Sequence, residues 1–307
     1  MDSFPVLFAA PGGGLGHLVR ACAVSVELAK LGLRSRIVTH SIYARGLRQA
    51  TGCTIDFIPG LQWKRAVRRY VDHAKPRLVV LDTFPWGIRA EWADSAPMPC
   101  RFVLLARRLN VPAYLEAAGL QWNAGSPFLR HAIVCEPLSR AYRKLLDASG
   151  SELHVLPGRI RLTPDDDSSR VSPRMMEMLR KKPTWLVVHS GPREEVQRLV
   201  ELAGSDMAEQ GDGQIVAVLP REEDYPGVFS FQFFPASILY PHVHRVVTGA
   251  GYNCIAETGP WRRKHLSRAF VRRYDEQEER LRGVYQEPIP SPENGARCAA
   301  RYIASLL

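Results

Sequence analysis

Short, fully apolar runs alternate with longer amphipathic segments along most of this chain, and this alternation restricts the fold more than any other feature. An apolar run of strand length is buried on both faces, as in a parallel sheet that helices cover on both sides. In the first half the expected strands are Val6 to Ala10, Arg36 to Thr39, Thr54 to Ile58, Leu78 to Leu81, Phe102 to Leu105 and Ile133 to Cys135, and the expected helices are Leu18 to Leu31, Tyr43 to Ala50 and Trp63 to His73. The sequence therefore predicts an α/β domain with a doubly wound, mostly parallel sheet.

The same alternation resumes after a polar stretch and predicts a second, smaller α/β domain. Its expected strands are Trp185 to His189, Gln214 to Leu219, Phe229 to Phe233, Arg245 to Thr248 and Leu266 to Val271, with helices Glu194 to Ala203 and Cys254 to Trp261. The stretch between the halves has the proline, serine and acidic content of a linker. We predict domains at 1–160 and 183–288, a linker at 161–182, and a helix in 289–307 that starts at a capping-type Ser291-Pro292-Glu293.

Composition narrows the class of protein. Of 307 residues, 46% are hydrophobic and 23% are charged, which is ordinary for a folded chain. The apolar runs are too short to span a bilayer, and the first residues do not resemble a secretion signal. Six cysteines lie without a paired spacing, so free thiols in a reducing cytoplasm are expected. The net charge of +10 favours anionic partners, although part of it serves as solubilising surface.

A glycine-rich loop follows the first expected strand. It reads Pro11-Gly12-Gly13-Gly14-Leu15-Gly16-His17 and leads into the next helix. The glycines let the backbone approach a ligand, and His17 then lies above the carboxyl edge of the sheet. Imidazole titrates near neutral pH, so His17 suits a general base, and the alternative is a histidine that caps the turn. Asp82 and Phe84 follow another strand at this edge, where they contact acceptor or sugar or, alternatively, form a structural turn.

A second glycine-rich turn lies late in the chain. Gly249-Ala250-Gly251-Tyr252-Asn253 leads from an apolar strand into a helix that carries Glu257, and Asp275-Glu276-Gln277 follows. The helix start offers backbone N–H groups and a positive dipole to a diphosphate. The carboxylate of Glu257 is suited to accept hydrogen bonds from the two hydroxyls of a ribose. The alternative is that the glycines only shape a strand-to-helix turn.

Together, the loop that ends in Gly16-His17, the linker, and the late glycine motif with Glu257 and Gln277 resemble the GT-B glycosyltransferases. The similarity is to the family of the lipid II-forming N-acetylglucosaminyltransferase of peptidoglycan synthesis, related to the UDP-sugar hydrolase of pseudaminic acid synthesis. The motifs match at about 12–20 and 234–277. Such enzymes have two Rossmann-like domains facing a central cleft, the first for the acceptor and the second for the nucleotide sugar. Their terminal helix crosses back to the first domain.

The resemblance assigns roles to individual residues. It implies that His17 is the base and that the transferred sugar and its nucleotide contact Gly14, Gly16, Ser190, Gly191, Phe234, Gly249, Gly251, Asn253, Glu257 and Gln277. Arg272 or Arg273, which depart from the family pattern, are expected to supply positive charge to the departing diphosphate. It implies an inverting transferase that uses a UDP-sugar and no metal or other cofactor, with an unidentified hydroxyl or amine as acceptor. The run from Pro260 to His265 departs from the family pattern. The acidic triplet Asp165-Asp166-Asp167 falls in the expected linker, so a metal site there is not predicted.

Other readings stay open. Water could replace the acceptor, which would make a nucleotide-sugar hydrolase, or the chain could bind nucleotide sugars without catalysis. The arginines and aromatics of Trp261 to Tyr274 suit nucleic acid, which the neighbouring motif makes a weaker reading. Basic and aromatic residues in Trp63 to Tyr70 suit an anionic membrane if the acceptor is a lipid. We expect a cytoplasmic protein, with peripheral contact at the inner face of the membrane left open.

Overall fold

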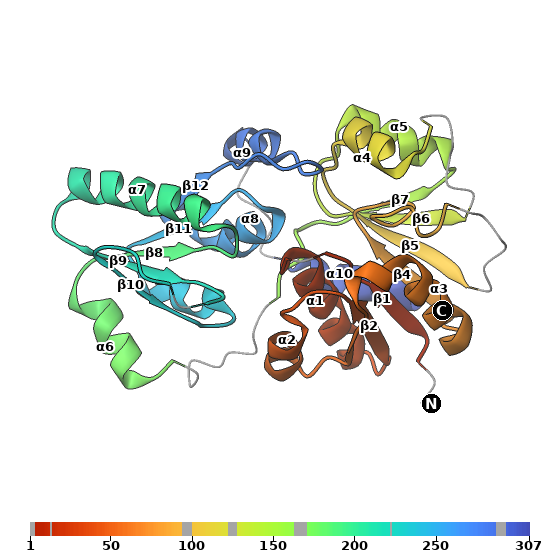
Figure 1. The fold of residues 1–307 in the computed structure, drawn as a ribbon, viewed down its shortest axis with the longest axis horizontal. Helices are drawn as coiled ribbons and strands as arrows, with labels where there is room; N and C mark the ends of the chain where they lie inside the picture. The colour runs from red at the N-terminus through yellow and green to blue at the C-terminus, as the bar shows by residue number, and fades with distance from the viewer. Residues whose placement is uncertain are drawn as a thin grey trace. The chain divides into compact units, whose positions relative to one another are not determined.

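The computed structural model describes residues 4–12, 14–93, 100–121, 128–162, 171–221, 223–286 and 293–307. The chain forms two compact units (Figure 1). The first domain consists of Met1–Leu162, Arg272–Glu276 and Ser291–Leu307, and the second of Thr163–Val271 and Gln277–Pro290. Each domain is built on one parallel sheet with helices against it, so the predicted fold class is confirmed.

The sheet of the first domain has seven parallel strands in the order β3-β2-β1-β4-β5-β6-β7. They are β1 (Val6–Ala9), β2 (Ser35–Thr39), β3 (Ile55–Phe57), β4 (Leu78–Asp82), β5 (Arg101–Ala106), β6 (Leu129–Val134) and β7 (Glu152–Val155). The central strands are buried on both faces because nearly every residue in them is apolar. The order places β1 directly beside β4, although two strands separate them in the chain.

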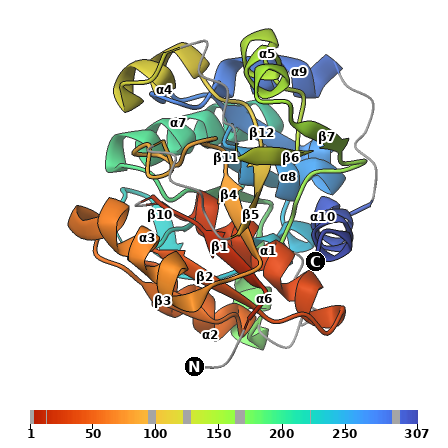
Figure 2. The same cartoon turned by 90° about the vertical axis from the view of Figure 1, so that its right-hand side faces the viewer.

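Helices cover both faces of this sheet (Figure 2). They are α1 (Gly16–Lys30), α2 (Ala44–Thr51), α3 (Trp63–Ala74), α4 (Val111–Ala118), α5 (Arg140–Ala148) and α10 (Gly295–Ser305), with a short 3₁₀ turn η1 (Gly60–Gln62). Apolar side chains of α3, α4 and α5 share one core with residues 7 and 9 of β1. Helix α10 lies along α1, the helix that carries His17.

The sheet of the second domain has five parallel strands in the order β10-β9-β8-β11-β12. They are β8 (Thr184–Val188), β9 (Gln214–Val218), β10 (Val228–Phe231), β11 (Arg245–Gly249) and β12 (His265–Arg268). Its helices are α6 (Pro173–Lys181), α7 (Arg193–Gln210), α8 (Tyr252–Thr258) and α9 (Gln277–Gln286), with 3₁₀ segments η3 (Ala236–His242) and η4 (Gly259–Lys264). No helix within the described ranges is long and apolar enough to cross a membrane.

Two segments differ from their expected structure. Part of the expected linker 161–182 forms helix α6, which Ser172 caps and whose Leu179 is buried in the core of the second domain. The acidic triplet of that stretch lies outside the described residues. The last helix begins at Gly295 with Asn294 as its cap, because the Asn294 side chain accepts a hydrogen bond from the backbone N–H of Ala296. The expected start, Ser291-Pro292, also lies outside the described residues.

Close packing at Gly295 gives a testable prediction about stability. A Cβ atom at Gly295 would lie 2.1 Å from the carbonyl oxygen of Gly158, so Gly295→Ala must push α10 away from its seat in the first domain. We expect this variant to lose about 1–3 kcal/mol of unfolding free energy, as in overpacked cores. Gly46→Ala is the matched control, since nothing lies within 4 Å of its Cβ position in α2. That change should stabilise by about 0.5–1 kcal/mol in urea unfolding, and equal effects of the two changes would contradict the packing argument.

Candidate functional site

His17 is the second residue of α1, just past the glycine-rich loop that follows β1. Within this loop, Gly12 has a φ of 117°, and a Cβ atom there would lie 3.0 Å from Cδ2 of His17. Gly12 is therefore the position where the geometry requires glycine. Gly14 and Gly16 have room for a side chain, and Gly13 lies outside the described residues. Gly12 packs against the imidazole of His17, and the predicted contact of Gly14 and Gly16 with the transferred sugar stays a prediction.

The His17 side chain meets a carboxylate from the neighbouring strand. Asp82 ends β4, and its Oδ2 lies 2.9 Å from Nδ1 of His17. Arg20, one turn further along α1, donates to the same oxygen from Nη2 at 2.7 Å. Arg20 and Asp82 are almost completely buried, at 2% and 5% exposure. Strand order explains this meeting, because β1 and β4 are adjacent and both end at the same edge of the sheet.

The charges of this group follow from its contacts. Burial favours a protonated Asp82, but the Arg20 guanidinium and the His17 ring hold the pKa of that carboxyl well below its usual range. Burial lowers the pKa of His17, and the carboxylate of Asp82 offsets part of that effect. His17 is therefore neutral at neutral pH. Its Nδ1 donates to the carboxylate, which leaves Nε2 as the proton acceptor.

Two neighbours hold Asp82 and His17 in place. Thr83 has a φ of 72°, in the left-handed region that a β-branched residue rarely adopts. Its Oγ1 donates to Oδ1 of Asp82 at 3.1 Å. The Phe84 ring lies 5.8 Å from the His17 ring, centroid to centroid, and is only 2% exposed. Asp82 and Phe84, for which the sequence left open contact with acceptor or sugar and a structural turn, are buried and contact His17, and strain is concentrated beside them.

In the second domain, the structure brings together several residues of the late motif. Gly249 ends β11 and Gly251 is the N-cap of α8. Gln277 begins α9, and its amide nitrogen is 4.0 Å from the Cβ position of Gly251. The Oε1 atom of Gln277 accepts a hydrogen bond from the backbone N–H of Phe270 at 3.0 Å. This bond orients the side-chain amide of Gln277 at the turn between β11 and α8.

A histidine–glutamate pair lies beside this turn. Nε2 of His189, just after β8, is 2.7 Å from Oε2 of Glu195 in α7. A Cβ atom at Gly191 would lie 2.4 Å from Nε2 of His189, so with the pair in this position only glycine fits there. The preceding residue, Ser190, is exposed. A Cβ atom at Gly249 would lie 3.2 Å from Cε1 of His189. An imidazole therefore flanks the glycine turn.

Glu257 is the half-buried carboxylate of α8. Loss of water around it raises its pKa to about 7, and within the described residues no side chain or backbone N–H donates to it. Such a carboxyl gains stability when a ligand hydroxyl bonds to it. Asn253, in the first turn of α8, is half-buried, as is Phe234 between β10 and η3.

The arginine expected at the donor belongs to the first domain. Arg273 lies in the segment Arg272–Glu276, which forms part of that domain, and its guanidinium is 5.3 Å from the Tyr274 ring centroid. Asp275 pairs with Arg107 at 2.7 Å in the same domain. The structure engages Asp275 in an ion pair that the sequence did not indicate.

Sequence reasoning missed three contributors to these sites. They are Arg20 on Asp82, the His189–Glu195 pair, and Arg280, whose Nη1 donates to the carbonyl oxygen of Ala250 at 3.0 Å. Arg20 follows His17 by three residues, so both share one helix face, and that spacing was a usable signal. Arg280 follows Gln277 by the same spacing. No local signal connects either arginine with its distant oxygen partner.

Comparison with known proteins places this arrangement among known folds. No protein-family model matches the sequence, and neither does any curated protein. Among solved structures, the glycosyltransferase SnogD from Streptomyces nogalater matches at 15% identity over 100% of both chains, with a TM-score of 0.57. The glycosyltransferase SsfS6 from Streptomyces sp. SF2575, complexed with thymidine diphosphate, matches at 15% identity over 98% of this chain and 94% of that chain, with a TM-score of 0.58.

A third match comes from a differently named enzyme. A structure described as a UDP-N-acetylglucosamine 2-epimerase from Listeria monocytogenes is 12% identical over 99% of this chain and 95% of that chain, with a TM-score of 0.62. At these identities the matches establish the fold. The chain has the GT-B fold, with two Rossmann-like domains.

Proposed function

We propose that the protein is a glycosyltransferase that moves a sugar from a nucleotide-sugar donor to an acceptor hydroxyl or amine, with inversion and with His17 as the general base. The observation that carries this proposal is the His17–Asp82 pair at the carboxyl end of β1. A neutral imidazole held by a carboxylate through Nδ1 is suited to accept a proton at Nε2. The GT-B fold, which the named glycosyltransferases share, supports the same reaction class.

In the proposed reaction the acceptor oxygen or nitrogen attacks the anomeric carbon. The new bond forms as the bond from that carbon to the diphosphate oxygen breaks, and the electron pair leaves with the diphosphate. The acceptor proton passes to Nε2 of His17 and then to water. Positive charge on the resulting imidazolium is stabilised by Asp82, which Arg20 keeps ionised.

The second domain would hold the leaving group. Backbone N–H groups at the start of α8 and the imidazole of His189 beside Gly249 can offset the charge of a diphosphate. Within the described part of the chain no group of three or more His, Cys, Asp or Glu side chains is placed to hold a metal ion. We propose that protein dipoles stabilise the diphosphate without a metal, with Glu257 on the ribose and Gln277 on the sugar.

The proposal also specifies the base of the donor nucleotide and the narrower family of the enzyme. Uracil is the proposed base of the donor nucleotide, supported by the likeness of the late motif to enzymes that use UDP-sugars. The narrower kinship with the lipid II-forming family is supported by the glycine loop before His17 and by the run from Gly249 to Glu257.

Thermal unfolding with UDP, TDP, GDP and ADP tests the proposal. A nucleotide at about 100 times its dissociation constant should stabilise by about 2.7 kcal/mol and raise the midpoint by several degrees. Glu257→Gln should abolish this rise, because the amide cannot replace a carboxylate on two hydroxyls. Without nucleotide, the same variant should be more stable at pH 8 by about 1–3 kcal/mol.

The sign of that second effect follows from the pKa. Folding raises the pKa of Glu257 from its ordinary value of 4.5 to about 7. The unfolding free energy therefore decreases as the pH rises from about 4.5 to 7, because the ionised carboxylate is less stable in the folded protein than in the unfolded chain. Glu201→Gln, at an exposed site on α7, is the matched control and should change neither quantity. If no nucleotide raises the midpoint of the unmodified protein, the proposed function is wrong. If free sugar forms from the donor without acceptor, the reaction is hydrolysis.

A further inference from the structure

A small cavity lies at the edge of the first sheet where β4 ends in Asp82, the residue that contacts His17. It has room for about one water molecule. It is lined by Ala9, Pro11, Trp63, Val67, Leu81, Asp82, Phe84, Gly87, Glu91 and Trp92. Phe84 and Asp82, which contact His17, form part of its wall, so the cavity adjoins the proposed base.

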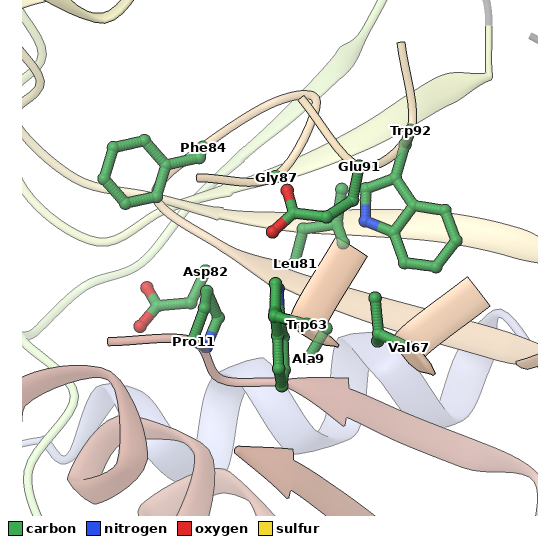
Figure 3. A pocket seen from close by; sticks show the side chains of 10 residues that line it. All are labelled: Ala9, Pro11, Trp63, Val67, Leu81, Asp82, Phe84, Gly87, Glu91 and Trp92. Atoms are coloured by element: carbon green, nitrogen blue, oxygen red, sulfur yellow. The ribbon is translucent and has the colours of Figure 1, made fainter. Parts of the chain in front are cut away.

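Glu91 points into this cavity from the loop that follows β4 (Figure 3). The residue is only 1% exposed. Its Oε2 accepts a hydrogen bond from the backbone N–H of Arg89 at 2.9 Å. Its Oε1 is buried and has no hydrogen-bond partner among the described residues. Burial raises the pKa of the Glu91 carboxyl, and hydrogen bonds from the Arg89 backbone and the Trp63 side chain offset part of that rise. A buried carboxyl oxygen without a donor costs free energy, so the fold maintains an unfavourable group beside the proposed base.

The loop is bent to keep Glu91 there. Three of its residues have positive φ, namely Thr83 at 72°, Gly87 at 81° and Ala90 at 52°. A Cβ atom at Gly87 would lie 1.9 Å from Oε2 of Glu91, so glycine alone leaves space for the carboxylate. The backbone therefore directs the Glu91 side chain back against the sheet edge and away from solvent.

The lining selects for a cation. It contains two carboxylates, Asp82 and Glu91, and no basic side chain. Arg20 already pairs with Asp82, which leaves Glu91 as the carboxylate able to take a new partner. The indole rings of Trp63 and Trp92 form much of the remaining wall, and indole is the aromatic group that attracts cations most strongly. An ammonium group is about the size of a water molecule and supplies the donors that Oε1 lacks.

We propose that this cavity binds the protonated amino group of the acceptor, with Glu91 Oε1 as its hydrogen-bond acceptor and the indoles of Trp63 and Trp92 beside it. The inference rests on the proposed function in that it calls the ligand an acceptor. A protonated amine has no lone pair with which to attack. The group that His17 deprotonates is therefore a hydroxyl, and the acceptor class is an amino alcohol, such as an amino sugar or an aminocyclitol.

The test is titration of the full chain with ethanolamine, a minimal amino alcohol, and with ethylene glycol, which replaces the amine by a hydroxyl. Tryptophan fluorescence reports binding because two indoles line the cavity. The unmodified protein should bind ethanolamine at least about tenfold more tightly than ethylene glycol, since a charged hydrogen bond is worth that much. Equal affinities, or no binding of ethanolamine, would overturn the proposal.

Two variants test whether ethanolamine binds at Glu91. Glu91→Gln keeps the shape of the side chain and removes its charge, so ethanolamine affinity should fall about tenfold or more. Glu116→Gln, at an exposed site on α4 of the same domain, should leave it unchanged. Unchanged affinity in Glu91→Gln would overturn the proposal. If that variant does not fold, the comparison of the two ligands on the unmodified protein decides alone.

The outcome is separable from that of the proposed function. The nucleotide-induced rise in unfolding midpoint is measured on the same samples and depends on the second domain. If no nucleotide raises the midpoint but ethanolamine binds in a way that requires Glu91, the proposal of glycosyl transfer is wrong and the proposal of an amine site stands. If nucleotide raises the midpoint but the protein does not prefer ethanolamine, the proposal of an amine site is wrong and that of glycosyl transfer stands.

Discussion

Replacing His17 with alanine is expected to lower kcat by about 10²–10⁴-fold, the usual contribution of a positioned general base. The imidazole is neutral and held by Asp82, so its removal takes away the proton acceptor without changing the buried ion pair beneath it. Nucleotide affinity should stay within about twofold, because the nucleotide is proposed to bind the second domain. Initial rates with saturating donor, together with midpoint shifts, measure both quantities.

His73→Ala is the matched control for this variant, since His73 is exposed on α3 of the same domain and should not affect kcat. The pH profile adds an independent check. The pKa of His17 lies below its ordinary value of 6.5, so kcat should fall only in the more acidic range. Donor KM should rise already as pH drops below about 7, where Glu257 becomes protonated. A kcat that is unchanged in His17→Ala would refute the assignment of the base.

Asp82→Asn is expected to harm both activity and stability. An amide can donate to Nδ1 of His17, which would place the imidazole proton on Nε2 and block the base, a change that costs about 10⁴-fold in a comparable histidine–aspartate pair. The same substitution removes the carboxylate that pairs with buried Arg20 at 2.7 Å. Loss of one partner from a buried ion pair typically costs about 3–5 kcal/mol.

A double variant separates these two effects. Asp82→Asn combined with Arg20→Met removes both charges, so part of the lost stability should return while kcat stays low. Asp147→Asn, exposed at the end of α5, is the control and should alter neither. Denaturant unfolding and initial rates are measured on all four proteins. Recovery of activity together with stability would show that Asp82 acts on the fold and not on His17.

The sequence predicted the fold because the central strands are short and apolar along their whole length. Leu78 to Leu81 can be buried on both faces only in a covered parallel sheet, and the structure has β4 there. The contact between His17 and Asp82 could not be predicted from the sequence, because β4, the strand beside β1 in the sheet, is not the next strand in the chain. Helix α6 was missed because it is short and follows a stretch whose composition is typical of a linker.

Charged residues were the least predictable. The basic surplus was interpreted as contacts with anions or as solvated surface, yet Arg20 and Arg280 are buried at 2% and 1% exposure and bind oxygens distant in sequence. Glu91 gave no signal at all. Its burial follows from the positive φ values of Gly87 and Ala90, and a single sequence does not reveal these for alanine.

The seat of α10 on α1 has a consequence for biosynthesis. Ala296, Ala299, Ala300 and Ile303 are fully buried there, although residues 1–162 are synthesised well over a hundred residues earlier. While the second domain is being translated, the face of α1 that will receive α10 stays uncovered. The helix that presents His17 thus completes its packing only after both sheets have been made.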